Sequence, residues 1–380
     1  MKKKNNLGAI GLEILIVPVV AIAAVIFFSN TRVEPFESKE PVLVENPKND
    51  LGSEVVQPKE DDGKLDIVTS LEDAIDEDAA WCGTFNLIWN DLRDELAKQD
   101  IVFEEQTQIV ENLNKGTFNV SCLSEDSYYK AYDHPTLEFK KEIENAIKKK
   151  FNEKSDILNS FKWTGNKTSY FLYCMLKKEF EFPKVFSKLG TEAFGNNQTA
   201  QYFGIDVSTD DSVRGQVRVL YYNSKNDFAV KLLTKQNDEV IVTVGCEKNS
   251  FGEIYASVLN NADKYKGSRR FNNMDELKIP NIKFDLKETI TEVMNKPFFF
   301  ADGREYVIDQ ALQTIKFELD EKGGRIKSEA GMMVSETTAI IEPPQPRLFY
   351  VDEAFTIFLI EEGRELPYFA AKISDIDNIQ

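Results

Sequence analysis

The sequence predicts an α+β fold, in which helices gather early in the globular body and strands gather late. Two stretches before residue 152 carry apolar residues at steps of three and four, the spacing of amphipathic helices. Residues 199–246 contain strand-like runs separated by turn residues, and residues 314–334 alternate between two faces, as half-buried strands do. The chain has 380 residues, of which 42% are hydrophobic and 11% aromatic, enough to bury a sizeable core.

The early part of the body begins with the first helix. Its apolar stripe comprises Trp81, Phe85, Ile88, Trp89, Leu92 and Leu96. We expect short strands at residues 100–103 and 118–123 and a polar turn region at residues 124–133. The second helix follows, and its inward face comprises Leu137, Ile143, Ala146, Ile147 and Phe151.

The later part of the body is rich in predicted strands. Residues 170–176 are apolar on both sides, as in a strand covered on both faces. Four further strands are separated by Asn, Asp, Gly and Lys turns; they are residues 199–206, 215–222, 228–234 and 239–244. A helix is expected at residues 251–266, and a short one at residues 286–294.

The chain is organised around residues 314–335. Residues 314–320 predict a strand, and a turn follows at Lys322, Gly323 and Gly324, where glycine adopts positive φ without steric cost. Beyond the turn, one face carries small and apolar residues, namely Gly324, Ile326, Ser328, Ala330, Met332 and Val334. The opposite face is charged, so the segment is able to lie as a strand with one buried face.

The amino terminus has the pattern of a membrane anchor. Three lysines precede an apolar run at residues 14–28, which extends back to Leu7 with Glu13 as its only charge. About 20 apolar residues span a bilayer, so we interpret residues 1–28 as a signal anchor and transmembrane helix that contacts the membrane through residues 7–28. A cleaved signal peptide is the alternative, because residues 21–23 resemble a cleavage site.

The region after the anchor predicts a disordered acidic stalk at residues 29–68, since it is rich in Glu, Pro, Asp, Lys and Ser. Residues 69–380 then form the globular domain. The lysines before the anchor favour a single-pass protein of the cell membrane, with this domain outside the cytoplasm. Net charge −18 argues against a nucleic-acid partner, and we expect a monomer.

Catalytic and metal chemistry lack their usual residues. The single histidine, His134, is followed by proline, and the four cysteines form no CxxC pair. No G-x-S-x-G elbow, P-loop or dinucleotide fingerprint is present. We therefore expect no cofactor, no metal and no enzymatic activity, although a pair of carboxylates among 64 acidic residues leaves carboxylate catalysis as a weaker alternative.

Three phrases carry a resemblance to a known family. They are residues 169–186 (SYFLYCMLKKEFEFPKVF), residues 316–323, and the C-terminal block at 346–360 (PRLFYVDEAFTIFLI) and 366–373 (LPYFAAKI). These phrases resemble the long central strand, the reactive-loop hinge and the C-terminal signature of serpins. The resemblance implies a large mixed β-sheet with helices packed on it and a second, smaller sheet.

The resemblance also implies a site. In inhibitory serpins, cleavage of an exposed loop lets its first half insert into the main sheet and trap the protease. The hinge would comprise Glu321, Lys322, Gly323, Gly324, Arg325 and Ile326. The bait would lie within residues 328–346, where the reactive-loop candidates are Ser328, Glu336, Thr337 and Thr338.

The hinge departs from the inhibitory pattern. Gly324 replaces the usual threonine, and Arg325, Ile326 and Lys327 replace a run of small residues. Ile326 points inward in the strand pattern, so its branched side chain would force the sheet to open wider. The leading hypothesis is therefore a non-inhibitory surface protein that binds through its loop region. The alternative is a suicide inhibitor of an exported serine or cysteine protease.

Overall fold

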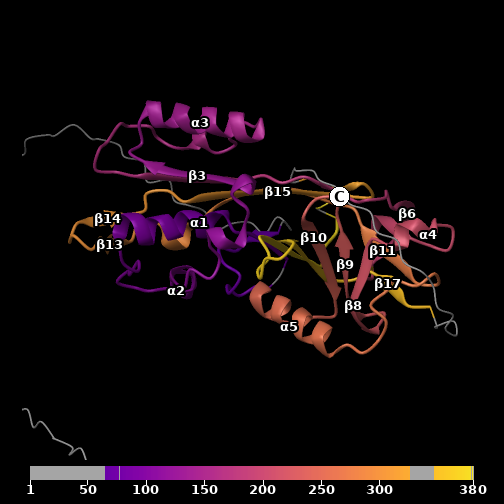
Figure 1. Ribbon diagram of the computed structural model, residues 1–380. Helices are drawn as coiled ribbons and strands as arrows, with labels where there is room; N and C mark the ends of the chain where they lie inside the picture. The colour runs from indigo at the N-terminus through magenta and orange to yellow at the C-terminus, as the bar shows by residue number, and fades with distance from the viewer. Residues whose placement is uncertain (1–64, 77, 326–345, 378, 380) are drawn as a thin grey trace, which may run out of the picture. The chain divides into compact units, whose positions relative to one another are not determined.

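The computed structural model describes residues 65–76, 78–325, 346–377 and 379, which all belong to one compact unit, residues 60–380. Within these residues the fold is α+β (Figure 1), as the sequence predicts. The expected transmembrane helix and most of the expected stalk lie outside the described residues. Among the residues that are described, no helix is both long and apolar enough to cross a membrane.

The largest element is a seven-stranded mixed sheet that forms the centre of the core. Its strands, in spatial order, are β1 (Asp66–Ile67), β2 (Ala79–Cys82), β19 (Phe369–Ile373), β18 (Phe355–Glu361), β10 (Asp238–Val244), β9 (Asp227–Leu233) and β8 (Val217–Ser224). Only the β1–β2 pair is parallel. Every residue of β18 is buried, because its two neighbours and the layers on both faces exclude water.

A four-stranded sheet carries the hinge and packs on the seven-stranded sheet. Its strands, in order, are β12 (Ile282–Thr289), β15 (Leu312–Asp320), β16 (Gly323–Gly324) and β5 (Phe180–Glu181). Phe284 of β12 and Phe317 of β15 pack against Phe369 of β19, with ring centroids 6.4 and 4.6 Å away. These aromatic contacts fix the hinge strand against the central core.

A second four-stranded sheet lies beside it in the fold. Its strands, in order, are β17 (Leu348–Tyr350), β11 (Glu276–Pro280), β7 (Gln198–Ile205) and β6 (Ser187–Phe194). A short hairpin joins β13 (Pro297–Phe299) to β14 (Glu305–Val307). The second sheet matters for the site because β17 is the first strand after residues 326–345.

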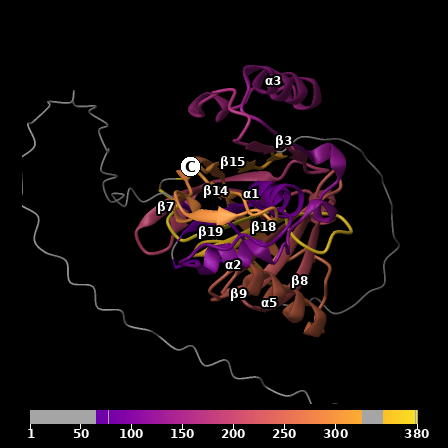
Figure 2. The same cartoon turned by 90° about the vertical axis from the view of Figure 1, so that its left-hand side faces the viewer.

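The remaining strand pair, β3 (Tyr128–Asp133) and β4 (Phe171–Leu176), is antiparallel. Helix α3 (Leu137–Phe151) lies over the outer face of this pair (Figures 1 and 2). A small second core forms there from Phe139, Ile143, Ile147, Leu158, Phe171 and Tyr173. The opposite face of β4 contacts the main core through Leu172, Cys174 and Leu176, which are only partly buried, so the predicted cover on both faces is complete on one face and partial on the other.

The other helices are short, apart from α5 (Phe251–Lys264), whose Phe251 and Tyr255 contact Phe358 of β18. The short helices are α1 (Thr84–Asn90), the π-helix η1 (Asp91–Ala97), α2 (Gln108–Asn114), α4 (Asp211–Arg214) and the 3₁₀ turns η2 (Val120–Cys122), η3 (Glu125–Ser127), η4 (Leu158–Ser160) and η5 (Thr291–Val293). The predicted helix at 137–151 and the four strands between residues 199 and 244 are confirmed, with ends shifted by two residues or fewer.

Three predictions for the early body are wrong. The first helix does not include Trp81, which lies on β2, a strand buried along its whole length. Residues 100–103 form no strand, and residues 118–123 contain a 3₁₀ turn instead of a strand. A strand buried on both faces has no alternating pattern. Trp81 of β2 therefore fitted the helical spacing of the apolar residues that follow it, and the predicted helix was extended too far back.

Three further expectations are corrected. The predicted turn region at 124–133 contains β3, whose pairing partner β4 lies about 40 residues away in sequence, so local composition gave no sign of it. The predicted helix at 286–294 is the end of β12 followed by a 3₁₀ turn. The body begins before residue 69, because Leu65 and Ile67 are buried and β1 pairs with β2.

Candidate functional site

The chain turns after β15 and returns as β16, which lies between β15 and β5. Gly323 and Gly324 pair with the end of β15 on one side and with β5 on the other. The backbone N–H of Phe182 also donates to the carbonyl of Lys322 at 2.8 Å. The predicted turn at Lys322, Gly323 and Gly324 is therefore corrected: the chain turns at Glu321 and Lys322, and the two glycines form a short strand in the middle of the sheet.

Neither glycine leaves room for a side chain. A Cβ on Gly323 would lie 2.2 Å from the carbonyl oxygen of Phe180, and its φ of 151° is one that other residues rarely adopt. A Cβ on Gly324 would lie 2.5 Å from Cζ of Phe180 and 2.8 Å from the carbonyl oxygen of Glu318. These contacts give a structural reason for Gly324, where the inhibitory serpin pattern has threonine.

Charged side chains surround the hinge. The Arg325 N–H donates to the carbonyl of Glu318 at 3.3 Å, and its guanidinium lies 3.8 Å from the Glu318 carboxylate. A hydrogen bond from Lys283 lowers the pKa of Glu318. The Glu321 carboxylate is buried beside Lys188 at 3.2 Å; burial alone would raise its pKa, but its own backbone N–H and Lys188 outweigh that and lower it.

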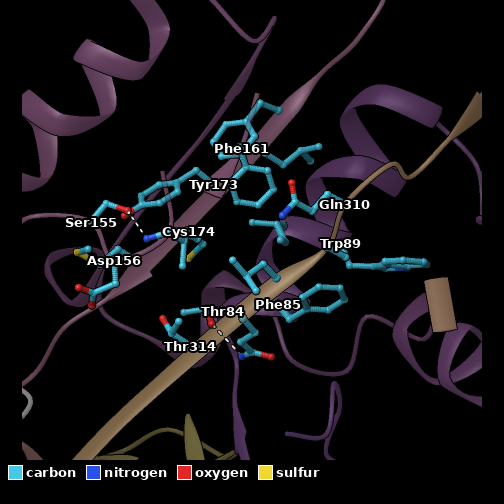
Figure 3. A pocket seen from close by; sticks show the side chains of 18 of the residues that line it. Thr84, Phe85, Trp89, Ser155, Asp156, Phe161, Tyr173, Cys174, Gln310 and Thr314 are labelled. Carbon is cyan, nitrogen blue, oxygen red and sulfur yellow. Dashed lines mark hydrogen bonds between the residues drawn. The ribbon is translucent and has the colours of Figure 1, made fainter. Parts of the chain in front are cut away.

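Below β16 a groove separates β4 from β15. Its volume is about 1480 Å³, and α1 forms its floor with Thr84, Phe85 and Ile88. Figure 3 shows Thr84 and Phe85 near Thr314 of β15, with Tyr173 and Cys174 of β4 across the space. The groove therefore continues the line of β16 between the same two neighbouring segments.

Both walls of the groove present strand edges. Among the described residues, β4 pairs with β3 alone, and the part of β15 that precedes Glu318 in the sequence pairs with β12 alone. Because backbone groups in an antiparallel ladder alternate in direction, the bond from Arg325 to Glu318 aims the even-numbered residues of β15 at the groove. The Lys177 N–H donates to Ser127 on the β3 side, so the even-numbered residues of β4 face the groove as well. Such edges are suited to accept another strand.

The segment between α3 and β4 reaches across the outer side of the groove. On the near wall Glu153 lies 2.6 Å from Lys177 of the β4–β5 connection. On the far wall Asp156 lies 3.3 Å from Lys316 of β15, and Lys287 of β12 donates to Ser160 at 3.1 Å. These polar contacts connect two walls that are not paired to each other.

A buried ionic cluster holds the joint between β4 and β5. Lys178 is 4% exposed; it lies 2.7 Å from Glu361 and contacts Asp238. Ser127 donates to Glu361 at 2.6 Å, and Tyr368 donates to Asp238 at 3.1 Å. Desolvation raises the pKa of Asp238. The pKa of Glu361 is lowered, because hydrogen bonds from Lys178 and Ser127 outweigh the effect of burial.

The point where the chain re-enters the described fold is also fixed. Arg347 pairs with the fully buried carboxylate of Asp275 at 2.6 Å and donates to the carbonyls of Ser268 and Arg270 at 2.7 Å. The described residues on either side of the gap at 326–345 are therefore held in place, by β16 before it and by Arg347 after it.

The structure describes five of the six predicted hinge residues, which are consecutive in the chain, and it places Gly323 and Gly324 beside Phe180. Ile326 and the reactive-loop candidates Ser328, Glu336, Thr337 and Thr338 lie outside the described residues. These predictions are untested.

The sequence interpretation missed Phe180, Lys178 and Gln313. Gln313 shares the inward face of β15 with Ile315 and Phe317, so a polar residue on an apolar face was the available signal. Lys178 gave no such signal, since its carboxylate partners are distant in sequence.

Comparisons with known proteins complete the description. No protein-family model and no curated protein matches the chain. Among solved structures it is similar to mouse protein-Z-dependent protease inhibitor, with 13% identity, coverage of 79% of this chain and 91% of that chain, and a TM-score of 0.45. It is also similar to human thyroxine-binding globulin (12%, 79% and 92%, 0.44) and to a serpin from Schistosoma mansoni (13%, 61% and 62%, 0.40).

Proposed function

We propose that this chain is an exported, membrane-anchored, serpin-like protein that works without catalysis and binds a protein partner through its loop region. The sequence phrases at 169–186, 316–323 and 346–373 support a serpin-like fold, and the position of β16 between β15 and β5 supports a serpin-like hinge. The solved structures to which the chain is similar include a protease inhibitor and a thyroxine-binding globulin. A monomer suffices for this binding.

The observation that carries the non-inhibitory part is that the hinge of the intact chain is already paired on both sides. An inhibitor of the serpin type stores free energy by keeping its loop out of the sheet until cleavage. Here Gly323 and Gly324 already occupy the first positions, so less insertion remains to be released. The next inward residue, Ile326, is larger than the small residues that favour fast insertion.

A second function, suicide inhibition of an exported serine or cysteine protease, is favoured by one observation. The groove of about 1480 Å³ presents strand edges from β4 and β15 along its walls. A cleaved loop would find hydrogen-bonding partners there without displacing a strand that the structure describes.

A protease challenge separates the two functions. The full-length chain in detergent is incubated with a panel of serine and cysteine proteases, and residual protease activity and SDS-stable complexes are measured. The proposal predicts cleavage within residues 328–346 with protease activity retained. A one-to-one covalent complex with loss of activity would establish the alternative, and an inhibitory serpin in the same assay shows that such complexes are detected.

The proposed location has its own test. Membrane fractionation of cells that produce the chain, followed by external protease, is expected to find the chain in the membrane fraction and its globular domain accessible from outside. A full-length chain that stays in the soluble fraction contradicts the anchor.

A further inference from the structure

The outer edge of β3 has no partner strand in the described part of the chain, where β3 pairs with β4 alone. The Lys177 N–H donates to the Ser127 carbonyl, so the odd-numbered residues of β3 direct their backbone groups at β4. The even-numbered residues Tyr128, Lys130 and Tyr132 direct theirs to the other side. A row of outward N–H and C=O groups at a strand edge is a template for another strand.

This edge is accessible and is not protected by a free charge. No residue of β3 is buried, and Tyr132 is 38% exposed. A lysine in an edge strand usually discourages pairing, because its charge repels or must be buried. Lys130 instead forms an ion pair with Asp91 of η1, whose side chain is 7% exposed. The positive charge at the centre of β3 is therefore already neutralised within the chain.

Helix α3 runs in the opposite direction to β3. It begins at Leu137, four residues after β3 ends at Asp133. Near its other end, the Lys150 ammonium lies 5.9 Å from the ring centroid of Tyr128, the first residue of β3. The first turns of α3 thus lie near the end of β3, and its last turns lie near the start of β3.

The side of α3 toward the open edge carries opposite charges at its two ends. Glu142 adds to the burial that raises the pKa of Tyr129, so this side of the helix lies near β3. Glu138, Asn145 and Lys149 share the side, because they stand at helical steps of three, four and seven residues from Glu142. All four of these helix residues are exposed. The pattern is acidic near the end of β3 and basic near its start.

We propose that two copies of this chain associate edge to edge through β3, as an antiparallel pair with Ala131 on the twofold axis. The outward residues then form the hydrogen-bonded pairs, and Lys130 of one copy lies opposite Tyr132 of the other. A register centred on Lys130 would set the two lysines opposite each other, which is unfavourable. A surface that complements itself about a twofold axis closes as a dimer and does not extend into a filament.

The two α3 helices complete the fit. The twofold axis makes them antiparallel, so Glu138 of each copy faces Lys149 of the other, and Glu142 faces Asn145. The small core beneath α3 takes side chains from both β3 and β4, so the helix covers the middle of that strand pair. The middles of the two pairs are two strand spacings apart, about 9.5 Å, and helices pack side by side at about 8–10 Å.

The inference goes beyond the proposed function, for which a monomer suffices. It is tested on the intact full-length chain and without a protease, so a chain that proves to be monomeric leaves the outcome of the protease challenge unchanged.

The first experiment is a cross-link at the twofold axis. Residues that face each other in a non-hydrogen-bonded antiparallel pair have Cα atoms about 4.5 Å apart, which suits a disulfide. The full-length variant Ala131→Cys in neutral detergent is oxidised with copper phenanthroline, and cross-links are mapped by mass spectrometry, which distinguishes them from those of the native cysteines. The matched control is Ala256→Cys, at an exposed position on α5.

A disulfide between residue 131 of two copies, formed well above the level of the Ala256→Cys control, supports the proposal. Equal cross-linking of the two variants, or no 131–131 disulfide, overturns it. The second result counts even if the chain is dimeric, because association through another surface or through the predicted anchor would not bring these residues together.

The second experiment is a charge exchange. The mass of the full-length chain is measured by sedimentation equilibrium in density-matched detergent at about 0.15 M salt, where long-range repulsion between copies is screened. Glu138→Lys and Lys149→Glu each place like charges across the axis twice, so each is expected to raise the Kd of the dimer about tenfold. The double variant restores opposite charges and is expected to return Kd to within about threefold of wild type.

Rescue by the double variant separates association from helix stability. The two exchanged residues stand about 16 Å apart along α3, too far to pair within one chain, and each exchange opposes the helix dipole. A merely structural effect therefore predicts that the double variant is the weakest of the three. That order, or a wild-type chain that sediments as a monomer, overturns the proposal.

Discussion

The replacement Gly324→Ala tests whether β16 is held by close packing. The new Cβ would lie 2.5 Å from Cζ of Phe180 and 2.8 Å from the carbonyl oxygen of Glu318. Carbon atoms in contact lie about 3.5–4.0 Å apart, so the ring has to move by about 1 Å or more. Phe180 is 2% exposed and packs against Phe182 at 6.2 Å, which limits that movement.

The magnitude follows from these contacts. Overpacking a filled site costs about 1–3 kcal/mol, and each kcal/mol shifts Tm by roughly 1.5 °C in a unit as long as residues 60–380. We therefore expect Gly324→Ala to lower Tm by about 1.5–4.5 °C in differential scanning calorimetry. Phe180→Leu, combined with Gly324→Ala, should show a favourable coupling of about 1 kcal/mol, since the shortened side chain removes the clash with the ring and leaves only that with the Glu318 carbonyl oxygen.

The matched control is Gly215→Ala. A Cβ on Gly215 lies 3.8 Å from its nearest atom, the carbonyl oxygen of Ser212, and its φ of −62° suits any residue. This variant should leave Tm unchanged or raise it slightly, because alanine restricts the unfolded chain. A Gly324→Ala protein as stable as the Gly215→Ala control would refute the close packing of β16.

Three further predictions concern the support of the site. Lys178→Ala leaves the Asp238 carboxylate buried without its cation and Glu361 with only Arg364, at 3.7 Å, and should cost about 3–5 kcal/mol in urea unfolding; a loss below about 1 kcal/mol would show that the cluster does not hold the β4–β5 joint. Glu361→Gln tests the lowered pKa of Glu361. A carboxylate with a depressed native pKa stabilises the fold above its ordinary pKa of 4.5, and this stabilisation is lost as the pH falls through the native pKa. The Tm difference between wild type and Glu361→Gln should therefore be full at neutral pH and close in strong acid, and a Tm difference that does not change with pH contradicts the lowered pKa. Ile143→Ala, at a fully buried position on α3, should cost about 2–5 kcal/mol, and a neutral result would mean that α3 does not pack on β4.

The late strands could be predicted because their signals are local. The strands from β7 to β10 alternate or run apolar between turn residues, and β15 shows a period of two from Gln313 to Asp320. The strand before the predicted hinge was indicated by the family resemblance, whereas Gly323 and Gly324, which the sequence places in the turn, form β16 instead.

The early strands could not be predicted because their partners are far away in sequence. β3 pairs with β4, and β2 lies between β1 and β19, so their stability comes from pairings that local composition does not reveal. Trp81 illustrates this, since its apolar neighbours fit a helix period while its backbone pairs with Ala370.

The groove could not be predicted from the sequence for a related reason. Its walls, β4 and β15, are about 140 residues apart in sequence. The role of the polar residues that line it depends on these two strands lying close together in the fold. Gln313 was visible as a polar residue on an apolar face, but its hydrogen bonds are defined only by the positions of Cys82 and Thr84.

The most direct test of the central claim is thermal unfolding of the full-length chain before and after one cut in the loop. A site for a sequence-specific protease replaces residues 337–342, and Tm is measured for the intact and the cut protein. If the hinge is already paired and no cleaved loop inserts into the groove, the Tm values of the intact and the cut protein should lie within about 2 °C of each other. A rise of about 10 °C or more on cutting would show that free energy was stored in an exposed loop, and would contradict the non-inhibitory account.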